Sequence, residues 1–292
     1  MIVPYSRQKI TKEDIDSVIN VLKSDYLTQG PMVPKFERAL STSVGAEYVT
    51  AVNSATSALH LACIALGVGV GDHVWTVPNT FVASANCALY CGASVDFVDI
   101  DPITYNICSS SLEKKLRLAK KSGTVPKVVI PVHFGGEPCD MAAIKRLSDK
   151  FGFKIIEDAS HAIGAKYLDF PIGSCEFSEI TVFSFHPVKI ITSGEGGAVL
   201  TNDSDLDQKI KLLRSHGITR EHNLMENPSD NSWYYEQIDL GFNYRMTDIQ
   251  AALGLSQLSN LLNYVEKRHK IAKVYDLELA GSLKLSNGSP HT

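Results

Sequence analysis

The chain has 292 residues, of which 44% are hydrophobic and 21% are charged, and its formal net charge is −4. This composition is ordinary for a folded globular protein, and the acidic balance lacks the basic surface that nucleic-acid binding requires. The sequence contains no apolar run of the ~20 residues that a membrane span needs, and the N-terminus lacks the apolar core of a secretory signal. We therefore expect a cytoplasmic protein with neither nucleic-acid nor membrane partners.

The first part of the chain predicts two helices. Thr11 and Asp14 have the spacing of a capping box, which indicates that a helix begins there. A loop at residues 26–31 separates this helix from a second one. The apolar residues that we expect on one face of the second helix are Val33, Phe36 and Leu40.

From residue 48 onwards, strand-like and helix-like segments alternate, which is typical of a parallel sheet covered by helices on both faces. The predicted strands are residues 48–52, 73–77, 94–98, 127–132, 153–158, 179–185 and 197–201. The predicted helices between and after them are residues 55–66, 81–89, 140–150 and 246–275. The nearly all-apolar run at 127–132 indicates a strand that is buried on both faces. The sequence thus predicts an α/β fold with a mostly parallel sheet.

Six cysteines are scattered along the chain without CxxC pairs: Cys63, Cys87, Cys91, Cys108, Cys139 and Cys175. Because disulfide frameworks belong to short secreted chains, we expect free thiols in a reducing cytoplasm. Cys87 and Cys91 stand one helical turn apart, but histidine ligands are missing nearby, so we expect no metal site.

The segment NSATSAL (Asn53–Leu59) lies where a predicted strand ends and a helix begins. Small residues let backbone N–H groups approach an anion closely, and a helix N-terminus favours negative charge. The hydroxyl groups of Ser54, Thr56 and Ser57 add further donors, which suits a phosphate monoester. A helix that is merely capped by serine and threonine explains this segment equally well on its own.

The segment IIEDASHAIGA (Ile155–Ala165) places Asp158 at the carboxyl end of a buried strand, where open α/β sheets bind their ligands. A buried carboxylate needs a cationic partner, and a protonated pyridine nitrogen is one candidate. The alternative is structural: Asp158 caps a helix that begins at Ala159.

The segment SFHPVKIITSGEGGAV (Ser184–Val199) holds a single lysine, Lys189, between a strand and a glycine-rich turn. Burial lowers the pKa of a lysine and makes its amine nucleophilic toward aldehydes. A solvated surface lysine is the default for such a residue taken alone. However, a phosphate cradle, a strand-end aspartate and a lysine together match the requirements of pyridoxal phosphate.

With these motifs in place, the chain resembles the fold type I sugar aminotransferases of the DegT/StrS type. The resemblance rests on segments that occur in family order: YLTQGP, TFVASAN, HFGGEPCDM, EDASHAIGA, SFHPVK, GEGGAV, LRSHG and NYRMTDIQAALGLSQL. They cover nearly the whole chain. The resemblance implies a fold type I large domain that binds pyridoxal 5'-phosphate, a transaminase reaction and a homodimer with shared active sites.

The resemblance also assigns roles to single residues. Lys189 matches the lysine that forms a Schiff base with the cofactor and shuttles a proton. Asp158 matches the aspartate that holds the ring nitrogen protonated. His161 matches a position beside the phenolic oxygen of the ring, and Phe81 matches the aromatic residue stacked on the ring.

Four further positions match the phosphate site of the family. These are Ala55, Thr56 and Ser184, together with Asn243, which matches a residue that reaches the phosphate of the neighbouring subunit. Many family members have glycine where this chain has Ala55. The segments that border the sugar pocket in the family contain Thr28, Gln29, Gly30 and His186.

Within the family, the motifs look closest to the transaminases of pseudaminic-acid synthesis. That subgroup transfers the amino group of glutamate to a UDP-linked 4-keto-6-deoxy-N-acetylhexosamine. Sister enzymes act on other keto sugars or on keto-inositol with nearly the same motifs, so these substrates remain alternatives. A related sugar dehydratase carries histidine at the position of Lys189, so the lysine favours transamination. An NAD-dependent dehydrogenase is disfavoured because NSATSAL lacks the GxGxxG glycines.

Family members continue beyond the long helix into a small C-terminal domain. We expect most of that domain to be absent, with residues 1–250 forming the large cofactor-binding domain and 251–292 a long helix and the start of the second domain. A truncated homologue that binds the cofactor without turnover is therefore the alternative to an active enzyme.

Overall fold

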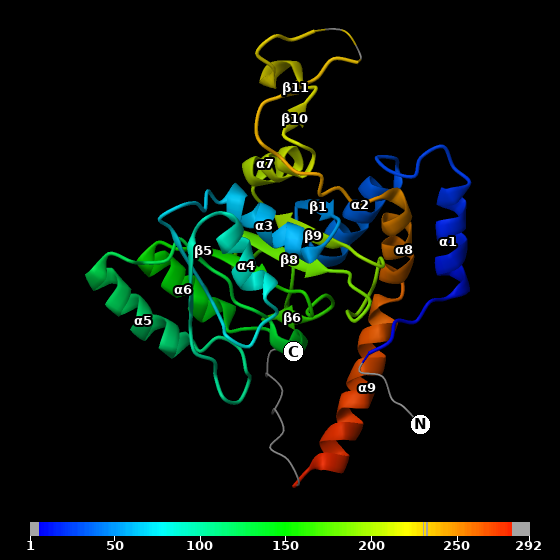
Figure 1. The fold of residues 1–292 in the computed structure, drawn as a ribbon. Helices are drawn as coiled ribbons and strands as arrows, with labels where there is room; N and C mark the ends of the chain where they lie inside the picture. The colour runs from blue at the N-terminus through cyan, green and yellow to red at the C-terminus, as the bar shows by residue number, and fades with distance from the viewer. Residues whose placement is uncertain (1–5, 230, 232, 282–292) are drawn as a thin grey trace.

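The computed structural model describes residues 6–229, 231 and 233–281, and its main feature is a seven-stranded sheet between two layers of helices (Figure 1). In spatial order the strands are β1 (Tyr48–Val52), β9 (Gly197–Thr201), β8 (Ile180–Ser184), β5 (Lys154–Asp158), β4 (Val128–Val129), β2 (His73–Thr76) and β3 (Ser94–Phe97). Neighbouring strands are parallel, except that β9 runs antiparallel to both β1 and β8. The expected α/β fold with a mostly parallel sheet is confirmed. The expectations about the two ends of the chain concern residues that lie outside the described part, namely 1–5 and 282–292.

Each face of the sheet is covered by three helices. On one face lie α2 (Met32–Val44), α5 (Ser109–Ser122) and α6 (Met141–Phe151); on the other lie α3 (Ala55–Ala65), α4 (Ala83–Tyr90) and α7 (Ser204–Arg214). Successive strand residues enter opposite cores, as Ile155 and Ile156 do, because side chains alternate along a strand. This burial on both faces explains why the central strands are rich in apolar residues, as in the Ile155 and Ile156 pair of β5.

The N-terminal helices pack outside this sandwich. In α1 (Lys12–Leu22) the predicted capping box is present: the Asp14 N–H donates to Thr11 Oγ1 at 3.3 Å, and the Thr11 N–H donates to Asp14 Oδ2 at 2.8 Å. α1 lies against α8 (Asp248–Leu258), which in turn packs on α2. At that contact a Cβ atom on Gly254 would lie 2.8 Å from the Phe36 ring, so the close approach requires glycine. The predicted buried face of α2 is confirmed.

The single helix expected at residues 246–275 is wrong. Two helices occupy this region, α8 and α9 (Leu261–Leu279), with a break at Ser259 and Asn260. The Ser259 hydroxyl donates to the Ser256 carbonyl oxygen at 2.6 Å, a local bond that competes with continued helix. After the break, α9 extends away from the main body of the molecule (Figure 1).

The strand expected at 127–132 is much shorter, because β4 contains only Val128 and Val129. Pro131 has no N–H to donate to a sheet ladder, so regular pairing ends before it. The remaining short elements are β6 (Lys166–Tyr167), β7 (Phe170–Pro171), β10 (Ile218–Thr219), β11 (Glu236–Gln237) and the 3-10 helices η1 (Phe134–Gly136) and η2 (His222–Leu224). β10 and β11 form a hairpin-like arm that projects from the body beyond α7 (Figure 1).

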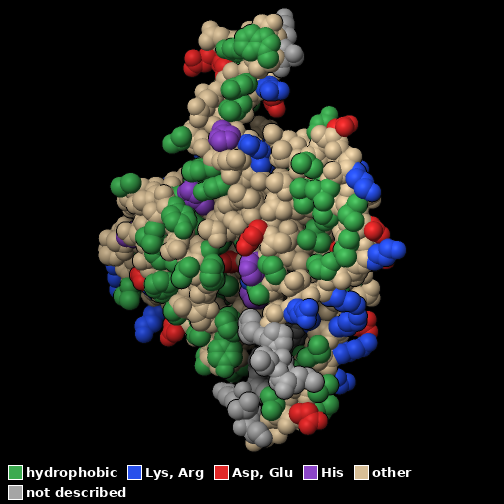
Figure 2. Space-filling view, turned by 45° about the vertical axis from the view of Figure 1, so that its right-hand side comes forward, with side chains coloured by type: hydrophobic (Ala, Val, Ile, Leu, Met, Phe, Trp, Pro, Cys, Tyr) green, Lys and Arg blue, Asp and Glu red, His purple; other side chains and the backbone are tan. Residues whose placement is uncertain are grey.

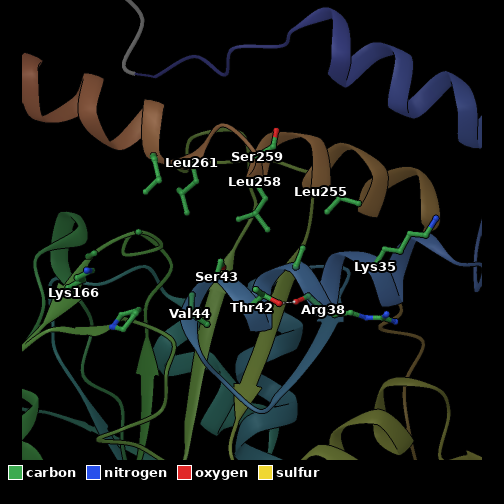
Figure 3. Close-up of a pocket in the computed structure, with 15 residues that line it drawn as sticks. Lys35, Arg38, Thr42, Ser43, Val44, Lys166, Leu255, Leu258, Ser259 and Leu261 are labelled. Atoms are coloured by element: carbon green, nitrogen blue, oxygen red, sulfur yellow. Dashed lines mark hydrogen bonds between the residues drawn. The ribbon is translucent and has the colours of Figure 1, made fainter.

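A cavity of about 740 Å³ lies between α2 and the junction of α8 with α9 (Figure 3). Figure 3 shows Leu255, Leu258 and Leu261 on one side of this cavity and Thr42 and Ser43 of α2 on the other. None of the residues expected at the cofactor or substrate site lines it. The chemistry predicted from the sequence therefore belongs elsewhere, at the sheet edge where β1, β5 and β8 end.

Candidate active site

Lys189 lies in a turn that follows β8, in which its N–H donates to the His186 carbonyl oxygen at 2.9 Å. The side chain is half-buried, and its Nζ lies 2.7 Å from Nε2 of His161. Burial lowers the pKa of the Lys189 amine from its ordinary value of 10.5, while the Asp158 carboxylate acts in the opposite direction. Lys189 is therefore not a solvated surface lysine, which was the default interpretation of this residue taken alone.

His161 is the direct partner of this amine. Burial, and after it the charge of Lys189, lower the pKa of His161 from its ordinary value of 6.5. Lys189 Nζ carries hydrogens in either protonation state, so it can donate a hydrogen bond to Nε2 of a neutral His161 imidazole. The pair holds the lysine nitrogen in one position without a carboxylate in direct contact.

Asp158 is the last residue of β5 and is 4% exposed. Its Oδ1 accepts hydrogen bonds from the hydroxyl and the N–H of Ser160, at 2.6 and 3.2 Å, and its Oδ2 accepts from the Ser84 hydroxyl at 2.6 Å. The alternative in which Asp158 caps a helix from Ala159 is wrong, because turns follow β5 instead of a helix. The carboxylate is held at a strand end by hydroxyl donors.

The expected anion cradle lies at the N-terminus of α3. Ser54 is the N-cap there, and its side chain accepts from the Ser57 N–H, which confirms the capping interpretation. The N–H groups of Ala55 and Thr56 occupy the first helical positions, where no carbonyl of the same helix can reach them. A Cβ atom on Gly197 would lie 2.6 Å from the Ala55 nitrogen, so this strand residue must be glycine for β9 to pass the cradle.

Ser184 and Phe81 lie at the same edge of the sheet. Ser184 ends β8, is buried, and pairs in register with Gly197, which brings it next to the start of α3. Phe81 precedes α4 and leaves 72% of its surface exposed, so its ring is available to a ligand or a second chain. Phe81 is joined to the Asp158 region through Ser84, whose N–H donates to the Phe81 carbonyl oxygen at 3.2 Å.

Asn243 reaches this edge from a distant part of the chain. Its carbonyl oxygen accepts from Asn53 Nδ2 at 3.4 Å, and Asn53 directly precedes the cradle of α3. The Asn243 side chain is exposed.

The expected sugar-pocket residues are linked through the start of α8. The loop of Thr28, Gln29 and Gly30 is fixed there, because Asp248 Oδ1 accepts from the Gly30 N–H at 3.0 Å and Thr28 forms a bridge with Thr247. From the same helix Gln250 donates to the Glu195 carbonyl oxygen at 2.9 Å.

The Glu195 carboxylate in turn lies 4.0 Å from the His186 imidazole. Figure 2 shows histidine and acidic side chains together near the centre of one face, with Lys and Arg side chains gathered below them.

Residues 8–290 match the DegT/DnrJ/EryC1/StrS aminotransferase family. The chain belongs to this family. It is 44% identical over 276 residues to the UDP-4-amino-4,6-dideoxy-N-acetyl-beta-L-altrosamine transaminase of Campylobacter jejuni, which covers 94% of this chain and 69% of that protein.

Two solved structures of the family resemble the fold closely. PseC of Helicobacter pylori, described as an aminotransferase involved in the biosynthesis of pseudoaminic acid, superposes with a TM-score of 0.86 and 35% identity over 95% of this chain and 71% of that one. A putative sugar aminotransferase of Streptococcus pneumoniae in its PLP form has a TM-score of 0.83 and 30% identity, and covers 96% of this chain and 72% of that one. The predictions of family, of fold type I and of a pyridoxal-phosphate-dependent aminotransferase are confirmed.

The residues at the sheet edge fit this cofactor chemically. They combine an anion cradle at the start of α3, a buried carboxylate at Asp158 and an amine of lowered pKa at Lys189. Each of these groups has a counterpart in the cofactor, whose phosphate is an anion, whose ring nitrogen can be a cation and whose aldehyde reacts with amines. Among the described residues, no group of three or more His, Cys, Asp or Glu side chains is arranged to hold a metal ion.

Four residues near this family site escaped the sequence analysis: Ser84, Ser160, Glu195 and Arg268. Ser84 and Ser160 donate to Asp158, and Arg268 Nη2 of α9 donates to the Lys189 carbonyl oxygen at 3.4 Å. Ser160 stands two residues after Asp158, so the motif itself contained that signal. The contact of Arg268 joins segments 79 residues apart and has no local signature.

Proposed function

We propose that this aminotransferase moves an amino group from glutamate to a UDP-linked 4-keto-6-deoxy sugar. The observation that carries the proposal is the 2.7 Å contact between Lys189 Nζ and His161 Nε2 beside the Asp158 carboxylate. The kind of sugar is supported by the C. jejuni transaminase of a UDP-linked dideoxy sugar, with 44% identity. The structural similarity to PseC, at a TM-score of 0.86, supports the same class of substrate.

In this proposal Lys189 carries both the cofactor and the proton that moves during the reaction. Pyridoxal phosphate supplies an aldehyde and an electron-withdrawing ring. Lys189 would hold the cofactor at that aldehyde, and its Nζ atom would take and return the proton that moves at the substrate carbon. Burial favours the neutral amine, which is the form that accepts a proton. His161 orients Nζ through the 2.7 Å contact, and Asp158 would hold the ring nitrogen.

The phosphate of the cofactor is held in this proposal by the N–H groups of Ala55 and Thr56, with Ser184 beside them. The helix N-terminus and the missing intrahelical acceptors support this role. Phe81 covers the ring, since its exposed face is free to stack.

The nucleotide sugar lies against Thr28, Gln29, Gly30 and His186 in this proposal. Glu195 and Arg268 border the same region. Arg268 adds a positive charge next to Lys189, which suits the diphosphate of a nucleotide-linked substrate.

The active form in this proposal is a homodimer in which Asn243 binds the phosphate of the partner. The exposed Asn243 side chain supports this, as does the β10–β11 arm (residues 218–240), which exposes several apolar side chains: Leu224, Trp233, Tyr235, Ile238 and Leu240. Exposed aromatic and aliphatic groups at this density are typical of a contact between chains.

A cytoplasmic location completes the proposal. The six cysteines are free in the structure, and four of them are buried, as is usual in a reducing compartment. In the described part of the chain, no helix combines the length and apolarity needed to cross a membrane.

The decisive experiment is incubation of the full chain with pyridoxal phosphate, L-glutamate and a panel of UDP-, dTDP- and GDP-linked 4-keto sugars. We expect an amino sugar and an equal amount of 2-oxoglutarate with the UDP-linked 4-keto-6-deoxy substrates, and neither product with the Lys189→Ala variant. Amination of another nucleotide sugar or of keto-inositol would reassign the substrate. If the cofactor binds and every keto substrate remains unchanged, the chain is a non-catalytic binder and the proposal is wrong.

A further inference from the structure

Three side chains next to the candidate cofactor site, Thr80, Ser84 and Asp158, are linked in series by hydrogen bonds. Thr80 Oγ1 is 2.8 Å from Ser84 Oγ, and Ser84 Oγ is 2.6 Å from Asp158 Oδ2. Ser84 is fully buried and Asp158 is 4% exposed. Bonds of this length to a buried carboxylate are strong, since the acceptor carries charge and water does not compete.

The direction of the protons in this chain follows from the chemistry of the groups. An ionised carboxylate only accepts, so Ser84 must give its single hydroxyl proton to Asp158. The Ser84 oxygen is then free to accept, and Thr80 donates to it. The longer contact from Ser84 to the Phe81 carbonyl, at 3.3 Å, competes weakly for the same proton.

The two oxygens of Asp158 are used differently. Oδ1 receives two hydrogen bonds, from the Ser160 hydroxyl and from the Ser160 N–H. Within the described part of the chain, Oδ2 receives one hydrogen bond, from Ser84. Because each carboxylate oxygen offers about two lone-pair positions, Oδ2 retains one position for a further donor.

We propose that Ser84 is a positioning residue that aims Oδ2 of Asp158 at the ring nitrogen of pyridoxal phosphate, with Thr80 fixing Ser84 from behind. The inference rests on the proposed role of Asp158. The Ser84 hydroxyl occupies one position on Oδ2 and so leaves the other pointing toward the cofactor. A negative charge on Asp158 would favour the protonated form of a ring nitrogen placed next to it.

The same chain of hydrogen bonds couples the carboxylate to the aromatic residue proposed to cover the ring. Phe81 lies between Thr80 and Ser84 in the turn before α4, and the Ser84 N–H donates to the Phe81 carbonyl oxygen. One short segment thus sets both the position of the ring cover and the direction of the carboxylate.

The experiment compares two cofactors on the full chain: pyridoxal phosphate, and its 1-deaza analogue, in which a C–H group replaces the ring nitrogen. For Ser84→Ala we expect about tenfold weaker binding of pyridoxal phosphate, the loss typical of a hydrogen bond to a charged group. The dissociation constant of the deaza analogue should be the same for variant and wild type, because that analogue has no nitrogen for Oδ2 to meet. An equal loss for both cofactors would mean a purely structural role and would overturn the proposal.

A second measurement reads the ring nitrogen directly. With ¹⁵N-labelled pyridoxal phosphate, the nitrogen resonance of the Ser84→Ala holoenzyme should move toward that of the unprotonated ring, and an unchanged resonance counts against the proposal. Thr80→Val keeps Ser84 in place and should shift the resonance in the same direction by less; it also serves if Ser84→Ala does not fold.

The proposed function can fail separately from this inference. Borohydride reduction of the wild type followed by peptide mapping should find the cofactor on Lys189. A label on another lysine refutes the function and this inference with it, whereas a label on Lys189 with equal losses for both cofactors refutes the role of Ser84 alone.

Discussion

At the scale of single residues, the contact between Lys189 and His161 brings two groups of lowered pKa within 2.7 Å. Burial is the main cause for both, and each would be more easily protonated in water. Folding therefore makes the protonation of both groups less favourable than it is in the unfolded chain. Such perturbed groups at a strand end are characteristic of catalytic sites.

This arrangement predicts a pH dependence of stability. The pKa of His161 is lower in the folded chain than in the unfolded chain, so the unfolded state binds more protons as the pH falls below about 6.5. The contribution of His161 to stability is thus present above that value and is lost as the pH falls through its lowered folded pKa. We expect the melting temperature of the cofactor-free His161→Gln variant to fall less steeply with decreasing pH than that of the wild type. A difference between the two proteins that stays constant with pH would contradict this assignment.

Asp158 gives a second prediction at this scale. Asparagine has the same volume and can still accept a hydrogen bond from Ser84 or Ser160, but it carries no charge to keep a facing ring nitrogen protonated. We expect Asp158→Asn to lower kcat by roughly 10²–10³-fold, the range found when a preorganised electrostatic group is removed, with little change in melting temperature. Unchanged turnover together with a lower melting temperature would show that Asp158 is only structural.

At the scale of secondary-structure elements, the site depends on one close approach of backbones. β9 enters the sheet beside the start of α3, where a Cβ atom on Gly197 would meet the backbone of Ser54 and Ala55 at 2.6 Å. Because those atoms are backbone, relief requires the helix N-terminus itself to move. Glycine at position 197 therefore allows β9 and the N-terminus of α3 to lie in contact.

Replacing Gly197 by alanine tests this coupling. We expect Gly197→Ala to lower the free energy of unfolding by about 1–3 kcal/mol, as overpacking does, and also to weaken binding of pyridoxal phosphate. Gly69→Ala is a matched control, since a Cβ atom there would have no neighbour within 4 Å and the backbone is not in the left-handed region. Chemical denaturation and cofactor titration measure both effects. Equal effects of the two substitutions would rule out the close approach as the cause.

The elements also show what sequence patterns contain and what they omit. The strands were predictable because burial on both faces enriches them in β-branched and aromatic residues, as in Ile180–Ser184. The break between α8 and α9 was not, because it depends on the hydroxyl of Ser259 and leaves the hydrophobic pattern unchanged. In the same way, the strand ends predicted the position of Asp158, whereas Ser84 meets Asp158 only through packing across 74 residues.

At the scale of the whole molecule, two groups of exposed apolar residues lie outside the sandwich of sheet and helices. On α9 these are Leu262, Ile271, Val274, Tyr275 and Leu277. The domain boundary expected at residue 250 falls inside α8, which packs against α1 and α2. We propose instead that the second part of the chain begins after Asn260, where the helix breaks.

The β10–β11 arm is the second exposed apolar region, and it leads directly into Asn243. Trp233 and Leu240 are 71% and 77% exposed, and the arm projects away from the sheet (Figure 1). A two-fold dimer needs a self-complementary surface, and a projecting arm that crosses to a second subunit provides one. Such a crossing would bring the exposed side chain of Asn243 to the cradle of the partner. Cofactor binding would then favour association, because a ligand held by two chains stabilises the assembled state.

Subunit mixing tests the shared site. Lys189→Ala and Asn243→Ala are each expected to be inactive as homodimers, the first without its reactive amine and the second with a weakened phosphate site. If Asn243 acts across the interface, a mixed dimer contains one site with both native residues and one site with neither. Random exchange of equal amounts makes about half of the dimers mixed, so we expect roughly a quarter of the wild-type activity to return. If Asn243 serves its own subunit instead, every site in a mixed dimer lacks one residue, and activity stays absent even when mass spectrometry shows that subunits have exchanged.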